Sequence, residues 1–230
     1  MSKELGFEVT RHMLRSFLKK IGYRWKRFRK SLKKHQDEED YQQKLIQLKD
    51  LIRLYQTGYI DLFFADESGF NMEGYIPYGW QPAGQYIEIT PSKTKGTQIF
   101  GLMSLDNQLH PYSLTGSMNS QAVIAFLDDF HSNIKKQTVV IIDNAPIHHS
   151  RLFKNKIEQW KKEDLFIFYL PKYSPHLNPI EILWRMIKYK WLKFEDIASQ
   201  AQLNEQLEDI LIQFGEKYTI DFKELKVSII

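Results

Sequence analysis

The sequence predicts an α/β domain, a mixed sheet with helices on both faces, preceded by a basic helical arm. From residue 59 onward, strand-like segments follow one another and then alternate with helical segments, which is typical of such a sheet. The run TVVII at 138–142 is continuously apolar, as expected of a strand buried on both faces. Residues 1–36 hold twelve Lys and Arg against two Asp and Glu, a net charge of +10, whereas the remaining residues carry −6. This asymmetry indicates that the arm binds a polyanion.

The arm contains one amphipathic helix and a basic linker. Residues 10–23 have helical periodicity, and we expect Thr10 to cap the start and Gly22 to end the helix in the left-handed conformation. A basic outer face is typical of a recognition helix, so the arm is predicted to hold a partial helix-turn-helix. The linker at 24–35 interleaves aromatic residues with cations for DNA phosphates. The predicted DNA-binding residues of the arm are Arg11, Arg15, Lys19, Arg24, Lys26, Arg27 and Arg29.

The remaining elements follow in order. We predict a connecting helix at 37–56, strands at 59–68, 86–91, 97–105 and 109–116, and a Gly/Pro-rich loop or hairpin arm at 74–85. Helices at 119–134, 150–162 and 178–191 then alternate with strands at 138–143 and 165–171. The predicted domains are 1–36 for the DNA-binding segment and linker, 37–58 for the connecting helix, 59–215 for a catalytic domain, and 216–230 for a tail.

Composition excludes several classes of protein. The chain has no cysteine, which excludes disulfides, thiolate metal sites and cysteine nucleophiles. It has no apolar run long enough for a membrane span and no signal peptide at its N-terminus. We therefore expect a cytoplasmic protein with no membrane partner.

Three carboxylates stand at element ends. Asp66 lies late in the first strand, Asp143 follows the TVVII run, and Glu181 opens the last helix. If the first strand and the TVVII strand are neighbours, the three side chains meet at one edge of the sheet. Clustered carboxylates raise one another's pKa unless a cation is present, and Mg²⁺ suits such oxygen ligands. Two such ions about 3.5–4 Å apart can clamp an in-line phosphoryl displacement.

Each carboxylate also has a purely structural interpretation. Asp66 can be a turn residue, and its neighbour Glu67 points to the other face of the strand. Asp143 with Asn144 can form an Asx-turn. Glu181 can complete a capping box with Asn178 as the N-cap. Three matching element ends together favour a site over three coincidences.

The histidines that follow Asp143 have a separate expectation. His148 or His149 is expected to approach the site or the DNA without binding metal. Polar groups at the start of a helix are the alternative interpretation for both residues.

Four blocks carry a family resemblance: FADESGF, GYIPYGWQPAGQ, VIIDNAPIHHS and YLPKYSPHLNPIEILWRMIKYKW. They resemble the DDE transposases of the bacterial insertion-sequence branch of the mariner-like superfamily, in family order over residues 8–200. The predicted element order is that of ribonuclease-H-like domains, the fold of this family. Lys172 and His176 stand where the family carries Pro and Asp, and neither position carries the chemistry.

The resemblance implies that Asp66, Asp143 and Glu181 bind two Mg²⁺ ions, for which Mn²⁺ can substitute. It implies cleavage at the ends of an insertion element by water, followed by attack of the freed 3′-OH on target DNA, commonly at a TA step. The implied partners are terminal-repeat DNA, target DNA and a second copy of the chain in a homodimer. Lys172 is expected to contact phosphate, and Trp80 to contact DNA or a partner subunit, or else to plug its own hairpin.

Two alternatives to a transposase remain open at this point. A ribonuclease-H-like nuclease would cleave without joining strands, and a truncated remnant would only bind DNA and repress transposition. Family members carry a two-part N-terminal DNA-binding region, and the first part is missing here. Either an upstream frame encodes it or the chain is a decayed fragment.

Overall fold

The computed structural model describes residues 9–24, 37–71, 96–193 and 199–222. The chain divides into two compact units, Met1–His35 and Gln36–Ile230, each of which is described by itself. The expectations for Lys26, Arg27, Arg29, Trp80 and the strand at 86–91 fall outside the described residues.

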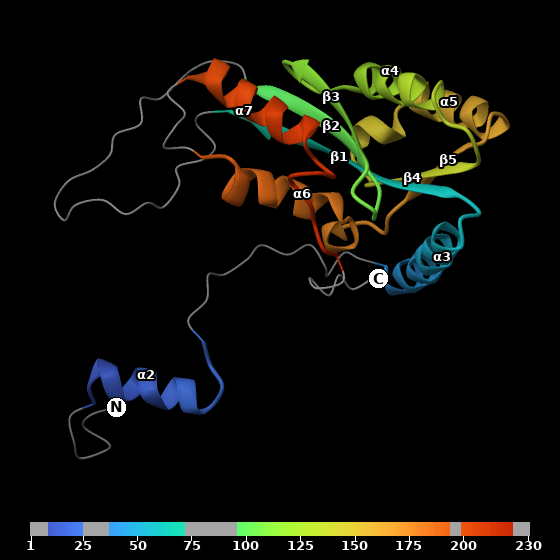
Figure 1. Ribbon diagram of the computed structural model, residues 1–230. Helices are drawn as coiled ribbons and strands as arrows, with labels where there is room; N and C mark the ends of the chain where they lie inside the picture. Colours follow the sequence, from blue (N-terminus) through green and yellow to red (C-terminus); the bar gives the residue numbers. More distant parts are fainter. Residues whose placement is uncertain (1–8, 25–36, 72–95, 194–198, 223–230) are drawn as a thin grey trace. The chain divides into compact units, whose positions relative to one another are not determined.

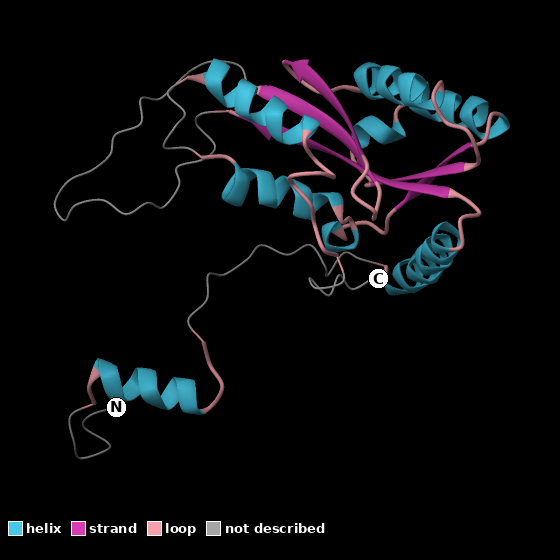
Figure 2. Ribbon diagram, viewed as in Figure 1, coloured by secondary structure: helices cyan, strands magenta, loops and turns pink. Residues whose placement is uncertain are grey.

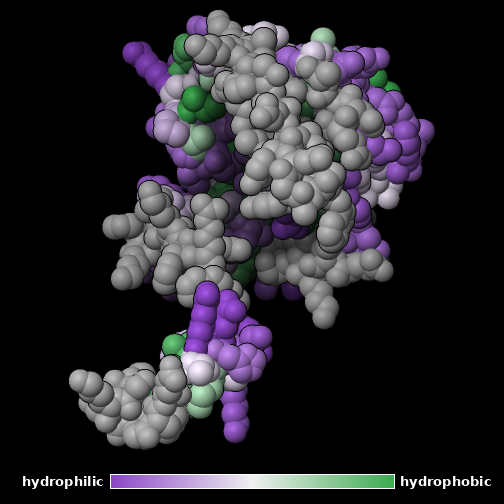
Figure 3. All heavy atoms as spheres, turned by 90° about the vertical axis from the view of Figure 1, so that its left-hand side faces the viewer, coloured by the Kyte–Doolittle hydropathy of each residue, from purple (hydrophilic) through white to green (hydrophobic). Residues whose placement is uncertain are grey.

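The first unit contains the helix α2 (Arg11–Lys20). The Thr10 hydroxyl accepts a hydrogen bond from the Met13 amide at 3.2 Å, and Gly22 has a φ of 88°, so both predicted helix ends are confirmed. Arg24 donates from Nη1 to the carbonyl oxygens of Lys19 and Tyr23, which satisfies the end of the helix. Apolar and polar side chains both lie on the surface of this unit (Figure 3). The exposed apolar residues of the helix are Met13, Leu14, Phe17 and Leu18.

The second unit is built on one five-stranded sheet with the strand order β3-β2-β1-β4-β5 (Figures 1 and 2). The strands are β1 (Asp61–Phe70), β2 (Thr97–Met103), β3 (Leu109–Thr115), β4 (Thr138–Ile142) and β5 (Leu165–Tyr169). β1 pairs antiparallel with β2 and parallel with β4, so the sheet changes sense at its central strand. The predicted neighbourhood of the first strand and the TVVII strand is confirmed.

Helices cover both faces of this sheet and enclose two apolar cores. Buried residues of α3, α6 and α7 pack on the face that carries Leu62 and Phe64 of β1. Buried residues of α4 and α5 pack on the face that carries Phe63 and Ala65. The helices are α3 (Glu38–Gln56), α4 (Ser120–His131), α5 (Arg151–Lys162), α6 (Ile180–Met186) and α7 (Gln200–Ile212).

The helix predicted at 178–191 differs from the observed one. The α-helical part begins at Ile180, and residues Ile187–Trp191 continue it as a π-helix, η4. Two 3₁₀ turns, η2 (Pro146–His149) and η3 (Pro175–Leu177), precede α5 and α6. No helix within the described residues is both long and apolar enough to cross a lipid bilayer.

Candidate active site

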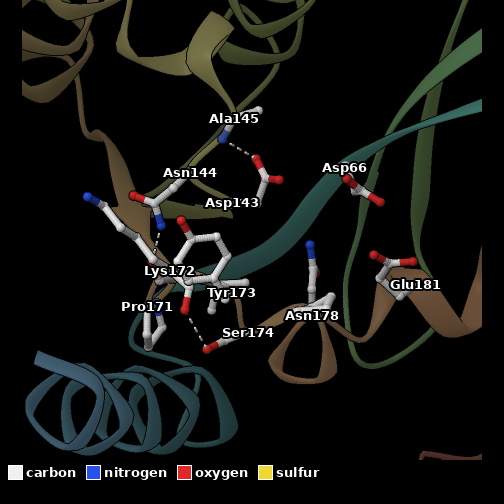
Figure 4. A pocket seen from close by; sticks show the side chains of 12 residues that line it. Asp66, Asp143, Asn144, Ala145, Pro171, Lys172, Tyr173, Ser174, Asn178 and Glu181 are labelled. Atoms are coloured by element: carbon white, nitrogen blue, oxygen red, sulfur yellow. Dashed lines mark hydrogen bonds between the residues drawn. The ribbon is translucent and has the colours of Figure 1, made fainter. Parts of the chain in front are cut away.

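The three predicted carboxylates line one cleft of about 520 Å³ in the second unit (Figure 4). Asp66 stands two residues beyond Phe64, the last β1 residue that pairs with β4. Asp143 directly follows β4, and Glu181 is the second residue of α6. The cleft therefore opens where β1 and β4 part, at the boundary between the parallel and antiparallel halves of the sheet. Asn144, Lys172, Tyr173 and Asn178 also line it.

The orientation of Asp66 depends on Trp184. The indole Nε1 of Trp184 donates to Asp66 Oδ2 at 3.1 Å. Gly101 of β2 lies opposite Asp66, and a Cβ at that position would be 2.8 Å from Trp184 Cη2. Glycine is therefore required for the indole to reach the carboxylate, because any side chain would occupy the space that the ring fills.

The capping-box interpretation of Glu181 is wrong. The N-cap residue of α6 is Pro179, and no side chain caps this helix. The Asn178 side chain is buried and donates instead from Nδ2 to the Ala65 carbonyl oxygen at 3.1 Å. That carbonyl lies beyond the last residue pair of β1 with β4, where a buried acceptor needs a donor from elsewhere. Asn178 thus ties the start of α6 to the strand next to Asp66.

Asp143 is both a turn residue and a cleft residue, the two roles that its position in the sequence suggested. Its Oδ1 accepts a hydrogen bond from the Ala145 amide at 2.8 Å, which is the expected Asx-turn, and its side chain also lines the cleft. Asn144 donates from Nδ2 to the Leu170 carbonyl oxygen, so it fastens the end of β4 to the end of β5. His149 lies on the outer side of this turn, with Nε2 3.3 Å from Asn144 Oδ1.

His148 lies inside the protein, beside two carboxylates. Its Nε2 is 3.3 Å from Glu67 Oε1 and 3.4 Å from Asp143 Oδ1, and its side chain is 2% exposed. The His148 ring also packs against Phe153 of α5, with the ring centroids 5.5 Å apart. Glu67, which the sequence placed on the face away from Asp66, therefore meets Asp143 through a histidine.

The acidic groups of the cleft repel one another, and this repulsion adds to the effect of burial on their pKa values. Burial raises the pKa of Asp66 well above its ordinary value, and the neighbouring Glu181, Glu67 and Asp143 raise it further. The pKa of Glu181 is also raised by its partly enclosed position, and Lys188 opposes this shift. Burial lowers the pKa of the Lys188 ammonium, and its attraction to Glu181 and Asp66 opposes this shift. A cation in the cleft would relieve this repulsion.

The donor set fits a hard divalent cation. All three groups are carboxylates, and the chain has no cysteine to offer a softer ligand. Within the described residues, no group of three or more His, Asp or Glu side chains lies close enough together to hold a metal ion as the side chains are oriented here. An open set of this kind suits Mg²⁺, which takes few protein ligands and leaves the rest of its shell to water and phosphate.

The sequence did not reveal two residues that build the site. Trp184 was part of the family block but had no assigned role, and Gly101 had none. Trp184 follows Glu181 by three residues, so the helical period does place both on one face of α6. Gly101 carries no comparable signal, because its effect depends on a helix that lies 80 residues further along the chain.

The sheet order, the flanking helices and the carboxylates from within β1, after β4 and at the start of α6 define a ribonuclease-H-like domain with an acidic cleft. The chain belongs to the DDE superfamily endonuclease family, which matches residues 61–204. This membership confirms the resemblance that the four sequence blocks indicated.

The relatives lie among transposable elements. The chain is 24% identical over 205 residues to the insertion element IS630 uncharacterized 39 kDa protein of Shigella sonnei, covering 86% of this chain and 57% of the relative. It resembles the solved Mos1 transposase paired-end complex with left transposon end (TM-score 0.58, 14% identity) and the Mos1 mariner paired-end complex with Mn (TM-score 0.60, 15% identity). Each match covers 92% of this chain and 65% of the Mos1 chain, and these likenesses establish the fold.

Proposed function

We propose that this chain is a transposase that cleaves DNA at the ends of an insertion element and joins the freed 3′ ends to target DNA. The observation that carries the proposal is the convergence of Asp66, Asp143 and Glu181 on one cleft. Membership of the DDE superfamily endonuclease family supports phosphodiester chemistry at these groups. The strand-transfer step is supported by the similarity to the Mos1 strand transfer complex, which shares this fold (TM-score 0.56).

We assign Asp66 and Asp143 as ligands of two Mg²⁺ ions, with Glu181 completing one of the two sites. Mn²⁺ is expected to substitute, since both ions accept carboxylate oxygens. When bound, such ions activate the attacking oxygen and stabilise the leaving oxygen. The chain's own groups hold the carboxylates in place, with Trp184 on Asp66 and the Ala145 amide on Asp143.

We assign the cations around the cleft to DNA phosphates. Lys172 is exposed and lines the cleft, and Lys188 interacts electrostatically with Glu181. The basic outer face of α2, which includes the exposed Arg11, Arg15 and Lys19, is proposed to bind the terminal repeats. In this assignment residues 1–36 bind DNA, 37–58 connect, and 59–215 carry the chemistry.

The proposed partners and location follow from the substrate. Two element ends are joined in one reaction, so we propose a homodimer on DNA, in agreement with the paired-end complexes in which Mos1 was solved. The proposed location is the bacterial cytoplasm, at the nucleoid. The chain spans 57% of the IS630 relative and 65% of the Mos1 chains, so these assignments concern the segment that the chain shares with them.

The test is a cleavage assay with plasmid DNA that carries the repeats flanking the gene, in Mg²⁺ or Mn²⁺. Wild type is compared with Asp143→Ala and with Glu158→Ala, a matched control on the exposed surface of α5. We expect cuts at the repeat ends and joined products from wild type and from Glu158→Ala, and neither from Asp143→Ala. Cutting that survives Asp143→Ala overturns the site, and cutting without joined products indicates a nuclease that lacks strand transfer.

A further inference from the structure

We propose that Glu67 and His148 form a positioning pair that fixes the Asp143 carboxylate for cation binding. Neither residue is itself a ligand in this arrangement. The inference rests on the proposed function, because it assigns the support of one proposed metal ligand.

The geometry places one ring nitrogen between two carboxylates. His148 Nε2 lies 3.3 Å from Glu67 Oε1 and 3.4 Å from Asp143 Oδ1. These are long contacts, as expected when one N–H is shared by two acceptors and aligned with neither. Contacts of this kind in unliganded active sites shorten when the ligand binds. Glu67 fixes the ring from one side, and the ring then reaches Asp143 on the other.

The pair has a polar environment that packing alone does not explain. Glu67 Oε1 and His148 Nδ1 are buried without an aligned hydrogen-bond partner among the described residues. Unsatisfied buried groups are costly and rare, and each calls for an explanation such as a catalytic role or a bound water or ion. An apolar residue in place of His148 would keep the packing against Phe153 but would leave the buried Glu67 carboxylate beside an apolar group.

Both contacts with the Asp143 carboxylate are made to the same oxygen, Oδ1. The Ala145 amide and His148 both meet Oδ1, which fixes the carboxylate within the Asx-turn. The second oxygen, Oδ2, is left facing the side of the cleft where Asp66 lies (Figure 4). The Asp143 side chain is 49% exposed, so without His148 its carboxylate would be held by the Ala145 amide alone. Loss of a partner that orients a metal ligand in this way weakens metal binding by about 10–100-fold.

Binding of Mn²⁺ to the full chain tests the pair without any need for catalysis. The dissociation constant is measured by electron paramagnetic resonance of free Mn²⁺, for wild type and three variants of His148. His148→Leu removes the donor, His148→Gln places an amide nitrogen near the position of Nε2, and His148→Asn is too short to do so. Urea unfolding of each variant reports on the fold separately.

We expect His148→Leu and His148→Asn to weaken Mn²⁺ binding by about 10–100-fold, and His148→Gln to remain within roughly threefold of wild type. Equal affinity of the Leu and wild-type proteins overturns the proposal, as does equal weakening by Gln and Asn. If the Leu variant does not fold, the Gln and Asn variants decide. Absence of Mn²⁺ binding by wild type refutes the proposed function, and the positioning pair with it.

Glu67 is tested in the same titration. Glu67→Gln keeps an acceptor oxygen for His148 and removes the charge, so we expect it to weaken binding by less than about tenfold. A loss as large as that of Asp143→Ala would make Glu67 a ligand and overturn its positioning role.

Discussion

Gly101 offers the sharpest test of how the cleft is built. A Cβ at this position would lie 2.8 Å from Trp184 Cη2 and 3.1 Å from Ile180 Cδ1, whereas carbon atoms in contact rest at about 3.5–4.0 Å. Gly101→Ala therefore requires both side chains to retreat by roughly 0.5–1 Å. Both belong to α6, which carries Glu181. Overpacking of this kind costs about 1–3 kcal/mol of unfolding free energy.

The effect on catalysis should exceed the effect on stability. The shift moves Glu181 relative to Asp66 and weakens the Trp184 hydrogen bond, and a displacement of about 1 Å lowers an enzymatic rate by about 100-fold. Urea unfolding and the plasmid cleavage rate measure the two effects.

Gly69→Ala is the matched control in the neighbouring strand. The new Cβ there would meet only the far end of the Gln98 side chain, which can rotate away. We expect near-normal stability and cleavage for Gly69→Ala. If Gly101→Ala unfolds and cleaves like the Gly69 control, the argument that the indole packs against this glycine is refuted.

Three further predictions concern charge and hydrogen bonding. The raised pKa of Asp66 means that the folded state holds its proton more tightly than the unfolded state, so metal-free wild type loses stability as the pH rises above the ordinary value of 3.8. Asp66→Asn should therefore be more stable than wild type by more than about 1 kcal/mol near pH 8, with the difference vanishing toward pH 4, as measured by urea unfolding without metal. Asn178→Ala leaves the buried Ala65 carbonyl without its donor and should cost about 1–3 kcal/mol in the same assay; an unchanged midpoint would contradict this role. Replacing the three α2 cations assigned above with Gln should flatten the salt dependence of DNA binding by roughly 0.9 in log–log slope per lost phosphate contact, and an unchanged slope would remove α2 from the interface.

The sequence predicted the parts of the site that follow from local pattern. The TVVII run identified a strand buried on both faces, and Asp143 at its end could be placed at the edge of the sheet from that alone. Asp66 followed from its register with the apolar residues of β1.

The remaining parts depend on contacts between distant segments. Asn178, Pro179 and Glu181 match the pattern of a capped helix, but the buried carbonyl of Ala65 takes the side chain that the helix would otherwise use. A local pattern cannot show this competition, because the acceptor lies 113 residues away. The π-helical end of α6 likewise has no simple sequence signal.

The hydrogen bonds between β1 and α6 also determine when the cleft can form during synthesis. The hydrogen bonds Asn178–Ala65 and Trp184–Asp66 span 113 and 118 residues, so they form only after the ribosome has released almost the whole domain. Domains fold as units during synthesis, and contacts of such long range form late. A nascent chain that stops before α6 would present Asp66 and Asp143 without the helix that completes their cleft. The cleft is therefore completed only once α6 has been synthesised.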